Sequence, residues 1–213
     1  MERKLFFFGD SICFGQGVSP HKTWVTRTAA KLNEEMPYPV VVANPSINGN
    51  TTRMALERMP FDVQSHNPDI VVVQFGLNDC NFWLTDNGMP RVSAKAFIAN
   101  MEEIVERCFK SGAKFVLVNT NHPTTRDKTV MPNTSYTYQQ HNKKYNELLR
   151  NAFCNYDSRV LLIDIEQVFE ATAKQKIPLE KLLLDDELHL SEQGHDVYYQ
   201  TVLPAIKKTM IYE

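Results

Sequence analysis

The chain has 213 residues, of which 43% are hydrophobic and 23% charged, a composition that suits one globular domain with a sizeable buried core. Its formal net charge is -2, from 23 basic and 25 acidic residues, and like charges form only short clusters. This balance excludes the strongly basic surface that nucleic-acid binding requires, so we expect no nucleic-acid partner. We expect a single domain over residues 1–213.

The amino-terminal sequence predicts neither a secretion signal nor a membrane span. The apolar run after Lys4 holds only four residues before Gly9, too few for the core of a signal peptide or for crossing a bilayer. The cysteines are Cys13, Cys80, Cys108 and Cys154. They lack Cys-x-x-Cys spacing, so neither a zinc site nor a disulfide framework is indicated. We expect a cytoplasmic protein with reduced thiols and no stable membrane insertion; the sequence does not predict an oligomeric state.

Five short runs rich in β-branched or aromatic residues predict buried strands. They are Lys4–Phe8, Val40–Ala43, Ile70–Gln74, Lys114–Asn119 and Val160–Asp164. Stretches with helical periodicity lie between and after these runs. They are Trp24–Glu35, Thr51–Ser65, Ser93–Lys110, Gln139–Phe153, Glu166–Gln175 and Ser191–Met210. Because apolar strands alternate with amphipathic helices, we expect an α/β fold with a parallel sheet covered by helices on both faces.

The loops that leave the carboxyl ends of the strands are the expected ligand-binding edge of such a sheet. Two of them, 77–91 and 120–137, are long for strand-to-helix connections and mix aromatic with basic side chains. The candidate substrate contacts are Phe82, Trp83 and Arg126. Arg126 and Lys128 could meet an anionic group of a substrate, although basic residues on long loops are more often simply solvated. Surface loops with their own apolar anchors explain the same residues equally well.

The segment Gly9-Asp10-Ser11-Ile12 follows the first apolar run and puts one hydroxyl on a tight turn that leaves a buried strand. A serine nucleophile sits in such a place, but it needs a base within hydrogen-bond reach and donors for the oxyanion it creates. Gly15 and Gly17 keep the space above the turn open. Taken alone, the segment also fits a polar turn in which Ser11 caps the next helix.

Two later loops offer donors for a negatively charged oxygen. Gly49, in the turn 44–52, would let its backbone N–H approach a ligand near the positive end of the following helix. Asn78, in Gly76-Leu77-Asn78-Asp79, supplies a neutral amide donor. Each loop also has a structural explanation. The first fits a glycine turn with Asn50 or Thr51 as helix N-cap, and the second fits an Asx-turn.

His189 is the best equipped of the six histidines to act as a base. Asp186 precedes it by three residues, a spacing that lets the carboxylate reach Nδ1 while Nε2 stays free. Asp185 is the alternative acid. Ser191 is a good start for the final helix, which puts His195 inside that helix and away from this role. An Asp-x-x-His pair is by itself more often a surface ion pair.

Taken in order, the four blocks resemble those of the SGNH hydrolases, also called GDSL esterases and lipases, and the resemblance spans nearly the whole chain. Within that family the chain looks most like the bacterial esterase, thioesterase and lysophospholipase branch. The resemblance implies a flavodoxin-like three-layer α/β/α sandwich with a five-stranded parallel sheet. It implies that Ser11 is the nucleophile, His189 the general base and Asp186 its orienting acid. The oxyanion donors would be Gly49, Asn78 and the backbone N–H of Ser11.

By the same resemblance, the expected activity is hydrolysis of carboxylic esters through an acyl-enzyme, with a small-molecule ester as partner and no metal or cofactor. An acyl thioesterase or lysophospholipase with the same machinery and a catalytically inactive binding module are the alternatives. Ile12 replaces the family's usual leucine, a volume-conserving change. Residues 120–137 match no family block, so the substrate is not implied. A phosphate cradle at the first loop is disfavoured, because the loop lacks a basic residue and sufficient glycines.

Overall fold

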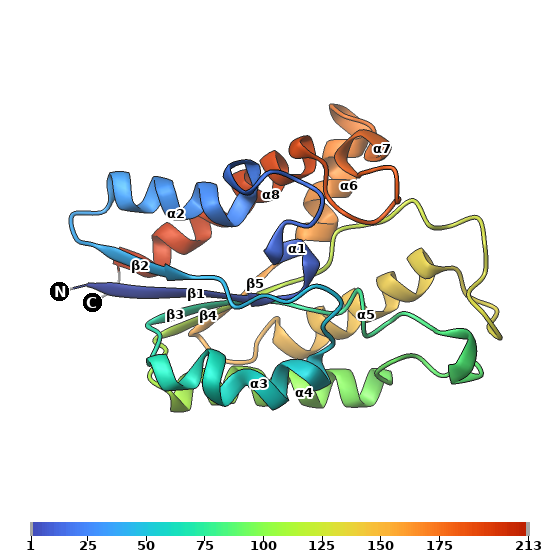
Figure 1. Ribbon diagram of the computed structural model, residues 1–213, viewed down its shortest axis with the longest axis horizontal. Coiled ribbons are helices and arrows are strands. Elements are labelled where there is room, and N and C mark those ends of the chain that lie inside the picture. Colours follow the sequence, from blue (N-terminus) through green and yellow to red (C-terminus); the bar gives the residue numbers. More distant parts are fainter. Residues whose placement is uncertain (1, 212–213) are drawn as a thin grey trace.

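The computed structural model describes residues 2–211, which form three layers with one sheet between two sets of helices (Figure 1). The strands are β1 (Arg3–Gly9), β2 (Val40–Ala43), β3 (Ile70–Gln74), β4 (Phe115–Asn119) and β5 (Val160–Ile163). All pairs are parallel, in the order β2-β1-β3-β4-β5. The strands alternate with helices as the hydrophobic pattern predicts, so the flavodoxin-like α/β/α sandwich is confirmed.

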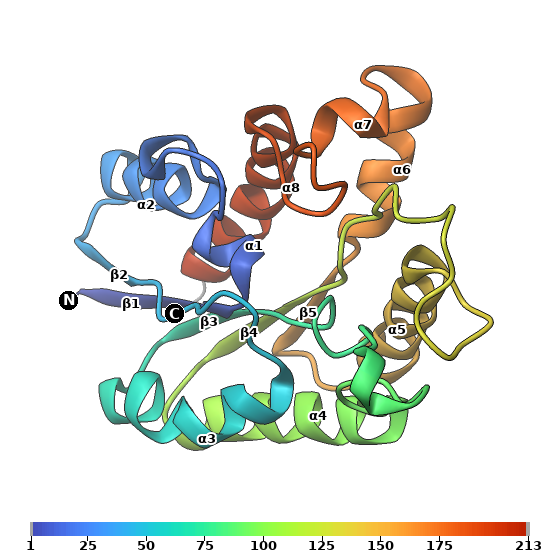
Figure 2. The same cartoon turned by 45° about the vertical axis from the view of Figure 1, so that its right-hand side comes forward.

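Helices cover both faces of the sheet (Figure 2). On one face lie α1 (Ser11–Phe14), α2 (Trp24–Glu35), α6 (Ile165–Gln175), α7 (Leu179–Leu182) and α8 (Glu192–Ile211). On the other lie α3 (Thr52–Asp62), α4 (Ala94–Lys110) and α5 (Tyr138–Phe153). Each connection crosses over the sheet, so the strand ends and the loops that follow them gather at one edge.

The main differences from the expected elements are short helices. The expected helix 51–65 divides into α3 and a 3-10 turn, η2 (Gln64–His66), since the end of an α-helix often tightens into that form. Two further 3-10 turns are η1 (Pro20–Lys22) and η3 (Leu84–Asp86), the second within a loop expected to be irregular. The helices α1 and α7 have four residues each. Single turns of this length are too short to show a helical repeat in the sequence.

Trp24 connects the sheet to the segment that carries Ser11. Its ring meets Phe7 of β1 edge-on at 5.2 Å and stacks on Tyr198 of α8 at 4.5 Å. The indole N–H donates to the carbonyl of Ile12 at 2.9 Å, which ties α1 to this aromatic group. All three rings are almost fully buried. The first turn after β1 is thus held by the core.

The structure bears on the expectations about cysteines and membrane spans, but not on those about domain number and location. The four cysteines are free thiols, three of them buried. Across residues 2–211, no helix combines the length and apolar character needed to cross a membrane. The single domain over 1–213 stays a prediction, and residues 1, 212 and 213 lie outside the described residues. The cytoplasmic location also stays a prediction.

His195 should make stability depend on pH. Burial lowers the pKa of its imidazole from 6.5 to about 4, and its Nδ1 accepts the backbone N–H of Trp24 at 3.2 Å. The unfolded chain therefore takes up this proton first, so the contribution of neutral His195 is present above the unfolded pKa and is lost as pH falls from 6.5 towards 4. His195→Asn removes that dependence. We expect the wild type to lose stability relative to the variant by up to ~1.4 kcal/mol per pH unit in this window.

Urea unfolding of both proteins at a series of pH values measures this difference. Subtracting the two curves cancels the titration of the other groups. Parallel curves would show that His195 is equally protonated in the folded and unfolded states.

Candidate active site

Ser11, His189 and Asp186 form a continuous hydrogen-bonded chain at the carboxyl edge of the sheet. Nε2 of His189 lies 2.9 Å from Oγ of Ser11, and Nδ1 lies 2.5 Å from Oδ2 of Asp186. Because an ionised carboxylate only accepts hydrogen bonds, Nδ1 carries the proton and Nε2 of the neutral ring accepts from the serine hydroxyl. Ser11 and His189 are almost buried, at 6% and 9% exposed. This arrangement can remove a proton from a hydroxyl and hold the resulting cation.

The turn after β1 presents the Ser11 hydroxyl. Asp10 is the N-cap of α1, and its Oδ1 accepts the backbone N–H of Ile12 at 3.0 Å. Ser11 is then the first helical residue, so its own N–H has no partner within the helix. Gly15 ends the helix in the left-handed region, with φ of 84°. The capping role considered for Ser11 therefore belongs to Asp10.

The segment with Asp186 and His189 is a tight turn closed by backbone hydrogen bonds. The N–H of Leu184 donates to the carbonyl of His189 at 2.7 Å, and Oδ1 of Asp186 accepts the N–H groups of Leu188 and His189. Partial burial opposes ionisation of Asp186, but the hydrogen bonds from the His189 ring and from these two N–H groups outweigh it. They hold the pKa of Asp186 below its usual value. Asp186 thus stays ionised beside the imidazole.

Gly49 and Asn78 approach the same edge from the loops after β2 and β3. Gly49 has φ of 76°, and nothing lies within 4 Å of the position a Cβ would take. Nδ2 of Asn78 donates to Oδ2 of Asp10 at 3.3 Å, which leaves its second N–H free to face a ligand. Arg91 Nη1 donates to the carbonyl of Gly49 at 3.2 Å and to Oδ1 of Asn78 at 3.4 Å. The two residues therefore share one neighbourhood.

The carboxyl groups of Asp10 and Asp79 are buried in the segments next to these donors. Burial raises the pKa of Asp10 to about 7, and repulsion from Asp79 adds to the effect. Burial also raises the pKa of Asp79 to about 6, although Thr52 donates to it from both its backbone N–H and its hydroxyl. Asp79 thereby connects the loop after β3 to the first turn of α3. These side chains serve to position neighbours in the loops rather than to face solvent.

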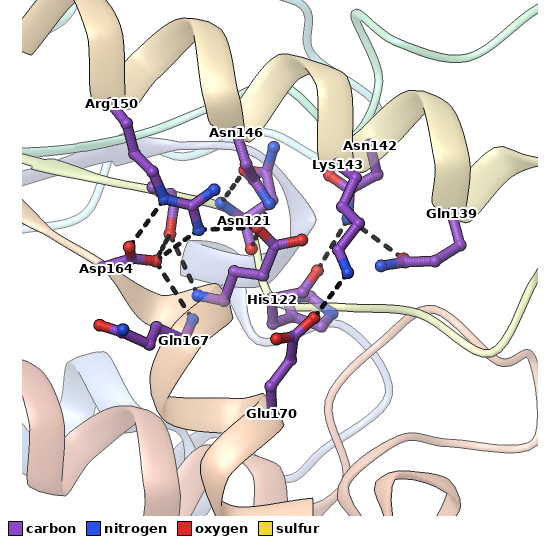
Figure 3. Close-up of polar contacts among 12 residues, drawn as sticks. Asn121, His122, Gln139, Asn142, Lys143, Asn146, Arg150, Asp164, Gln167 and Glu170 are labelled. Carbon is purple, nitrogen blue, oxygen red and sulfur yellow. Dashed lines mark hydrogen bonds and ion pairs between the residues drawn. The ribbon is translucent and has the colours of Figure 1, made fainter.

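A buried polar network joins the loop after β4 to α5 (Figure 3). The backbone of Asn121 exchanges two hydrogen bonds with the side chain of Asn146, at 2.8 and 2.9 Å. Asn142 donates to the carbonyl of His122 at 3.0 Å. Nε2 of His122 lies 2.8 Å from the carbonyl of Leu188, and burial lowers the pKa of this ring to about 4. His122 is therefore neutral, and it donates to the turn that carries His189.

Arg150 belongs to the same network and is paired with two carboxylates. Arg150 of α5 donates to both carboxylate oxygens of Asp164 and to Glu166 (Figure 3). Thr120 joins the end of β4 to this group, because its hydroxyl donates to Asp164 and accepts the backbone N–H of Glu166. These contacts fix the start of the loop 120–137 against α5 and α6.

The structure separates the residues considered for the acid and base roles. Asp186 reaches the His189 ring, whereas none of the hydrogen bonds within the described residues joins Asp185 to it. His195 is buried inside α8 and binds the backbone of Trp24. Of these two histidines, His189 is the one that lies between Ser11 and an aspartate, and its role as base stays a prediction.

The three candidate substrate contacts have different surroundings. Phe82 is only 6% exposed and packs on His141, with ring centroids 4.8 Å apart, so it offers a ligand little surface. Trp83 is 52% exposed, and Arg91 stacks over its ring at 4.3 Å. Arg126 donates to the carbonyl of Asp186 through Nε and Nη2, at 3.0 and 2.7 Å. Arg126 thus braces the turn that carries His189.

Two small cavities lie at the loops of this edge, and each is lined by an arginine that contacts the site: Arg126 bonds the carbonyl of Asp186, and Arg91 bonds Asn78. One of about 300 Å³ lies between the loop 120–137 and the His189 turn, and its lining includes Arg126, Tyr138 and Glu187. The other, of about 250 Å³, lies beside the first turn of α3, where Trp83 and Arg91 contribute to its wall. Both volumes are at or below the low end of the range for small-molecule sites.

Sequence reasoning did not identify several residues that shape this edge. Asp10 lies in the Gly9-Asp10-Ser11 segment, and an aspartate directly before a helix is a common N-cap, so the sequence did indicate its capping role. Arg58 has an i,i+4 partner in Asp62, but its contacts at this edge are with Asn50 and with the backbone carbonyls of Gly9 and Pro45, all in distant loops. His122 likewise acts through one carbonyl, that of Leu188, far along the chain. Contacts of this kind depend on the packed fold and leave no spacing pattern.

The chain is similar in sequence to known proteins. A model of the GDSL-like lipase/acylhydrolase family matches residues 7–197. An arylesterase of Vibrio mimicus is 30% identical over 125 residues, which are 59% of this chain and 58% of that protein. The thioesterase 1/protease 1/lysophospholipase L1 of Escherichia coli is 35% identical over 75 residues, which are 35% of this chain and 34% of that protein. The matches thus span little more than half of these relatives at most.

The fold is also similar to solved structures over nearly its full length. A lipase/acylhydrolase of Enterococcus faecalis superposes with a TM-score of 0.76 at 22% identity, covering 97% of this chain and 96% of that one. At this identity the similarity shows a shared fold.

Replacement of Gly49 by alanine tests the open space beside this glycine. We expect Gly49→Ala to lose about 1 to 2 kcal/mol of stability, the cost of a left-handed residue with a Cβ, because nothing crowds the new methyl group. Gly15→Ala is the matched control, since it has a similar φ of +84° but its Cβ would lie 2.2 Å from Cγ2 of Thr23. It should lose clearly more stability in urea unfolding. Equal losses would contradict an open space at Gly49.

Proposed function

Because the chain belongs to the GDSL-like lipase/acylhydrolase family, we propose that it is a serine esterase that hydrolyses carboxylic esters through a Ser11-His189-Asp186 triad. The observation that carries the proposal is the unbroken path of hydrogen bonds from the Ser11 hydroxyl through both ring nitrogens to Asp186, with 2.9 and 2.5 Å links. A buried hydroxyl paired in this way has an adjacent base and an ion partner for that base.

In the first half of the reaction, Oγ of Ser11 attacks the ester carbonyl carbon while Nε2 of His189 takes the hydroxyl proton. The carbonyl oxygen gains a negative charge, and we assign its donors as the N–H groups of Ser11 and Gly49 and the side-chain amide of Asn78. Collapse of this intermediate breaks the bond to the alcohol oxygen, which leaves with the proton from His189. The acyl group then stays on Ser11 as an ester.

In the second half, water attacks the acyl-enzyme and gives its proton to His189. The bond between the acyl carbon and Oγ breaks, the carboxylic acid leaves, and Ser11 regains its proton. Asp186 stays ionised throughout and stabilises the imidazolium that forms in each half. Its lowered pKa supports this role.

Ser11 should be the site of covalent labelling. A fluorophosphonate probe forms a stable bond only with a serine whose hydroxyl is activated, so we expect one adduct per chain, located on the Ser11 peptide by mass spectrometry. Ser11→Ala should remove both the label and the esterase activity. Ser191→Ala is the control, because that hydroxyl donates to the carbonyl of Lys181 instead of meeting a histidine. An active enzyme whose Ser11 stays unmodified would refute the triad.

The size of the cavities supports short esters as substrates. The cavities of about 300 and 250 Å³ are each lined by an arginine that contacts the site, Arg126 in one and Arg91 in the other. Methylene groups of a substrate that extend beyond such spaces would stay in water and gain none of the ~0.8 kcal/mol per buried group. The curated relative from Escherichia coli is named as a thioesterase and lysophospholipase. Acyl thioesters and lysophospholipids are therefore the second class of substrate to compare.

A series of p-nitrophenyl esters beside matched acyl thioesters separates these classes. We expect kcat/KM to be higher for acetyl and butyryl esters than for the palmitoyl ester, and higher for esters than for thioesters of the same chain. A steady rise to the palmitoyl ester would instead indicate that the loop 120–137 encloses a long acyl chain. A preference for thioesters would favour the second class.

A further inference from the structure

Arg91 lies beside the proposed oxyanion donors because the loop that it ends folds back on its own start. The N–H of Arg91 donates to the carbonyl of Asn81 at 2.9 Å, and the N–H of Val92 donates to that of Asp79 at 3.1 Å. These two bonds close the loop 79–92 at its base. Arg91 therefore lies close to Asn78, although it is 13 residues further along the chain.

The guanidinium of Arg91 contacts the loop that carries Asn78 and the loop that carries Gly49, the two residues proposed with Ser11 as oxyanion donors. Its Nη1 donates to Oδ1 of Asn78 at 3.4 Å and to the carbonyl of Gly49 at 3.2 Å. The Trp83 ring lies under the guanidinium at 4.3 Å, and Arg91 is partly buried. Stacking and burial reduce the freedom of the side chain, so its donors hold a fixed direction.

The orientation of the Asn78 amide is set by the different hydrogen-bond partners of its oxygen and its nitrogen. The oxygen end accepts from Arg91, and the nitrogen end donates to Asp10, 3.3 Å away. A flipped amide would put its NH₂ group against the guanidinium and its oxygen against the carboxyl group of Asp10. While Asp10 is ionised, this flip would break both hydrogen bonds of the Asn78 side chain. Arg91 and Asp10 together therefore favour the orientation in which an Asn78 N–H is available near Ser11.

We propose that Arg91 is a positioning residue for the oxyanion site: its guanidinium fixes the Asn78 amide in the orientation that stabilises the transition state, and it holds the carbonyl of Gly49, which restrains the residue whose N–H is the other proposed donor. This inference rests on the proposed function. Arg91 touches neither the triad nor, by this proposal, the reacting atoms. Its effect should appear in kcat rather than in KM, because a donor that is aligned for the oxyanion matters most when the charge develops.

Arg91→Met keeps much of the aliphatic length and removes the donors. Loss of a complete oxyanion donor costs roughly a hundredfold to a thousandfold in kcat, so we expect the loss of a positioning group to cost about tenfold to a hundredfold, with KM changed by less than about threefold. Arg91→Lys retains the charge but presents one ammonium group in place of the planar fork, and it should recover only part of the activity. The urea midpoint of each variant shows whether it is folded.

The control for lost charge is Lys95→Met. Lys95 is an exposed cation near the start of α4, and no hydrogen bond or ion pair involves its side chain within residues 2–211. We expect its kcat to stay within about twofold of the wild-type value, as for a surface substitution away from the site.

A double-mutant cycle with Asn78→Ala distinguishes positioning from general damage. If Arg91 acts through Asn78, then Arg91→Met should cost much less in the Asn78→Ala background than in the wild type. Equal losses in both backgrounds, an effect confined to KM, or an unchanged kcat in Arg91→Met would each overturn the proposal. Fluorophosphonate labelling of wild-type Ser11 distinguishes a failure of this inference from a failure of the proposed function. If Ser11 is not an activated serine, the wild-type protein is not labelled; if only the role of Arg91 is wrong, labelling of the wild type is retained.

Discussion

The register between β1 and β3 is the constraint on which the rest of the site depends. Gly9 pairs with Gln74 at the ends of the two strands, so the chain leaves both strands at the same height in the sheet. Asp10 and Asn78 then meet across this edge, with Ser11 beside them. A shift of the register by one residue would exchange the faces of every side chain on the strand. Ser11 and the amide group of Asn78 are thus placed by the backbone pairing.

The edge is maintained at an electrostatic cost. Two carboxyl groups, Asp10 and Asp79, lie fully buried with raised pKa values. Each is held by donors from another segment, namely Asn78 for Asp10 and Thr52 for Asp79. Removal of one such donor leaves a buried acceptor unsatisfied, which costs more than the bond contributed. The carboxyl groups therefore make the relative positions of three loops specific, in addition to any contribution to stability.

The sequence was sufficient to predict the alternation of strands and helices, because continuous apolar runs such as 70–74 differ clearly from the amphipathic period of 94–110. The contact between Asp186 and His189 was also predictable, since the two residues lie near each other along the chain, while their catalytic roles stay predictions. The environment of Phe82 was not predictable, because its burial depends on His141 of a helix formed later in the sequence. The contacts of Arg91 and His122 are with loops distant in sequence, so only the packed structure reveals them.

The hydrogen bond between Ser11 and His189 joins residues separated by 178 positions, and Gly17 packs where a side chain would collide with Leu184, beside the turn that carries the histidine. The first and last segments of the fold must therefore both be in place before the His189 ring meets the Ser11 hydroxyl. During synthesis the amino-terminal strand emerges long before the histidine does. The Ser11 hydroxyl therefore has no imidazole partner in the growing polypeptide until the carboxyl-terminal segment has joined the fold.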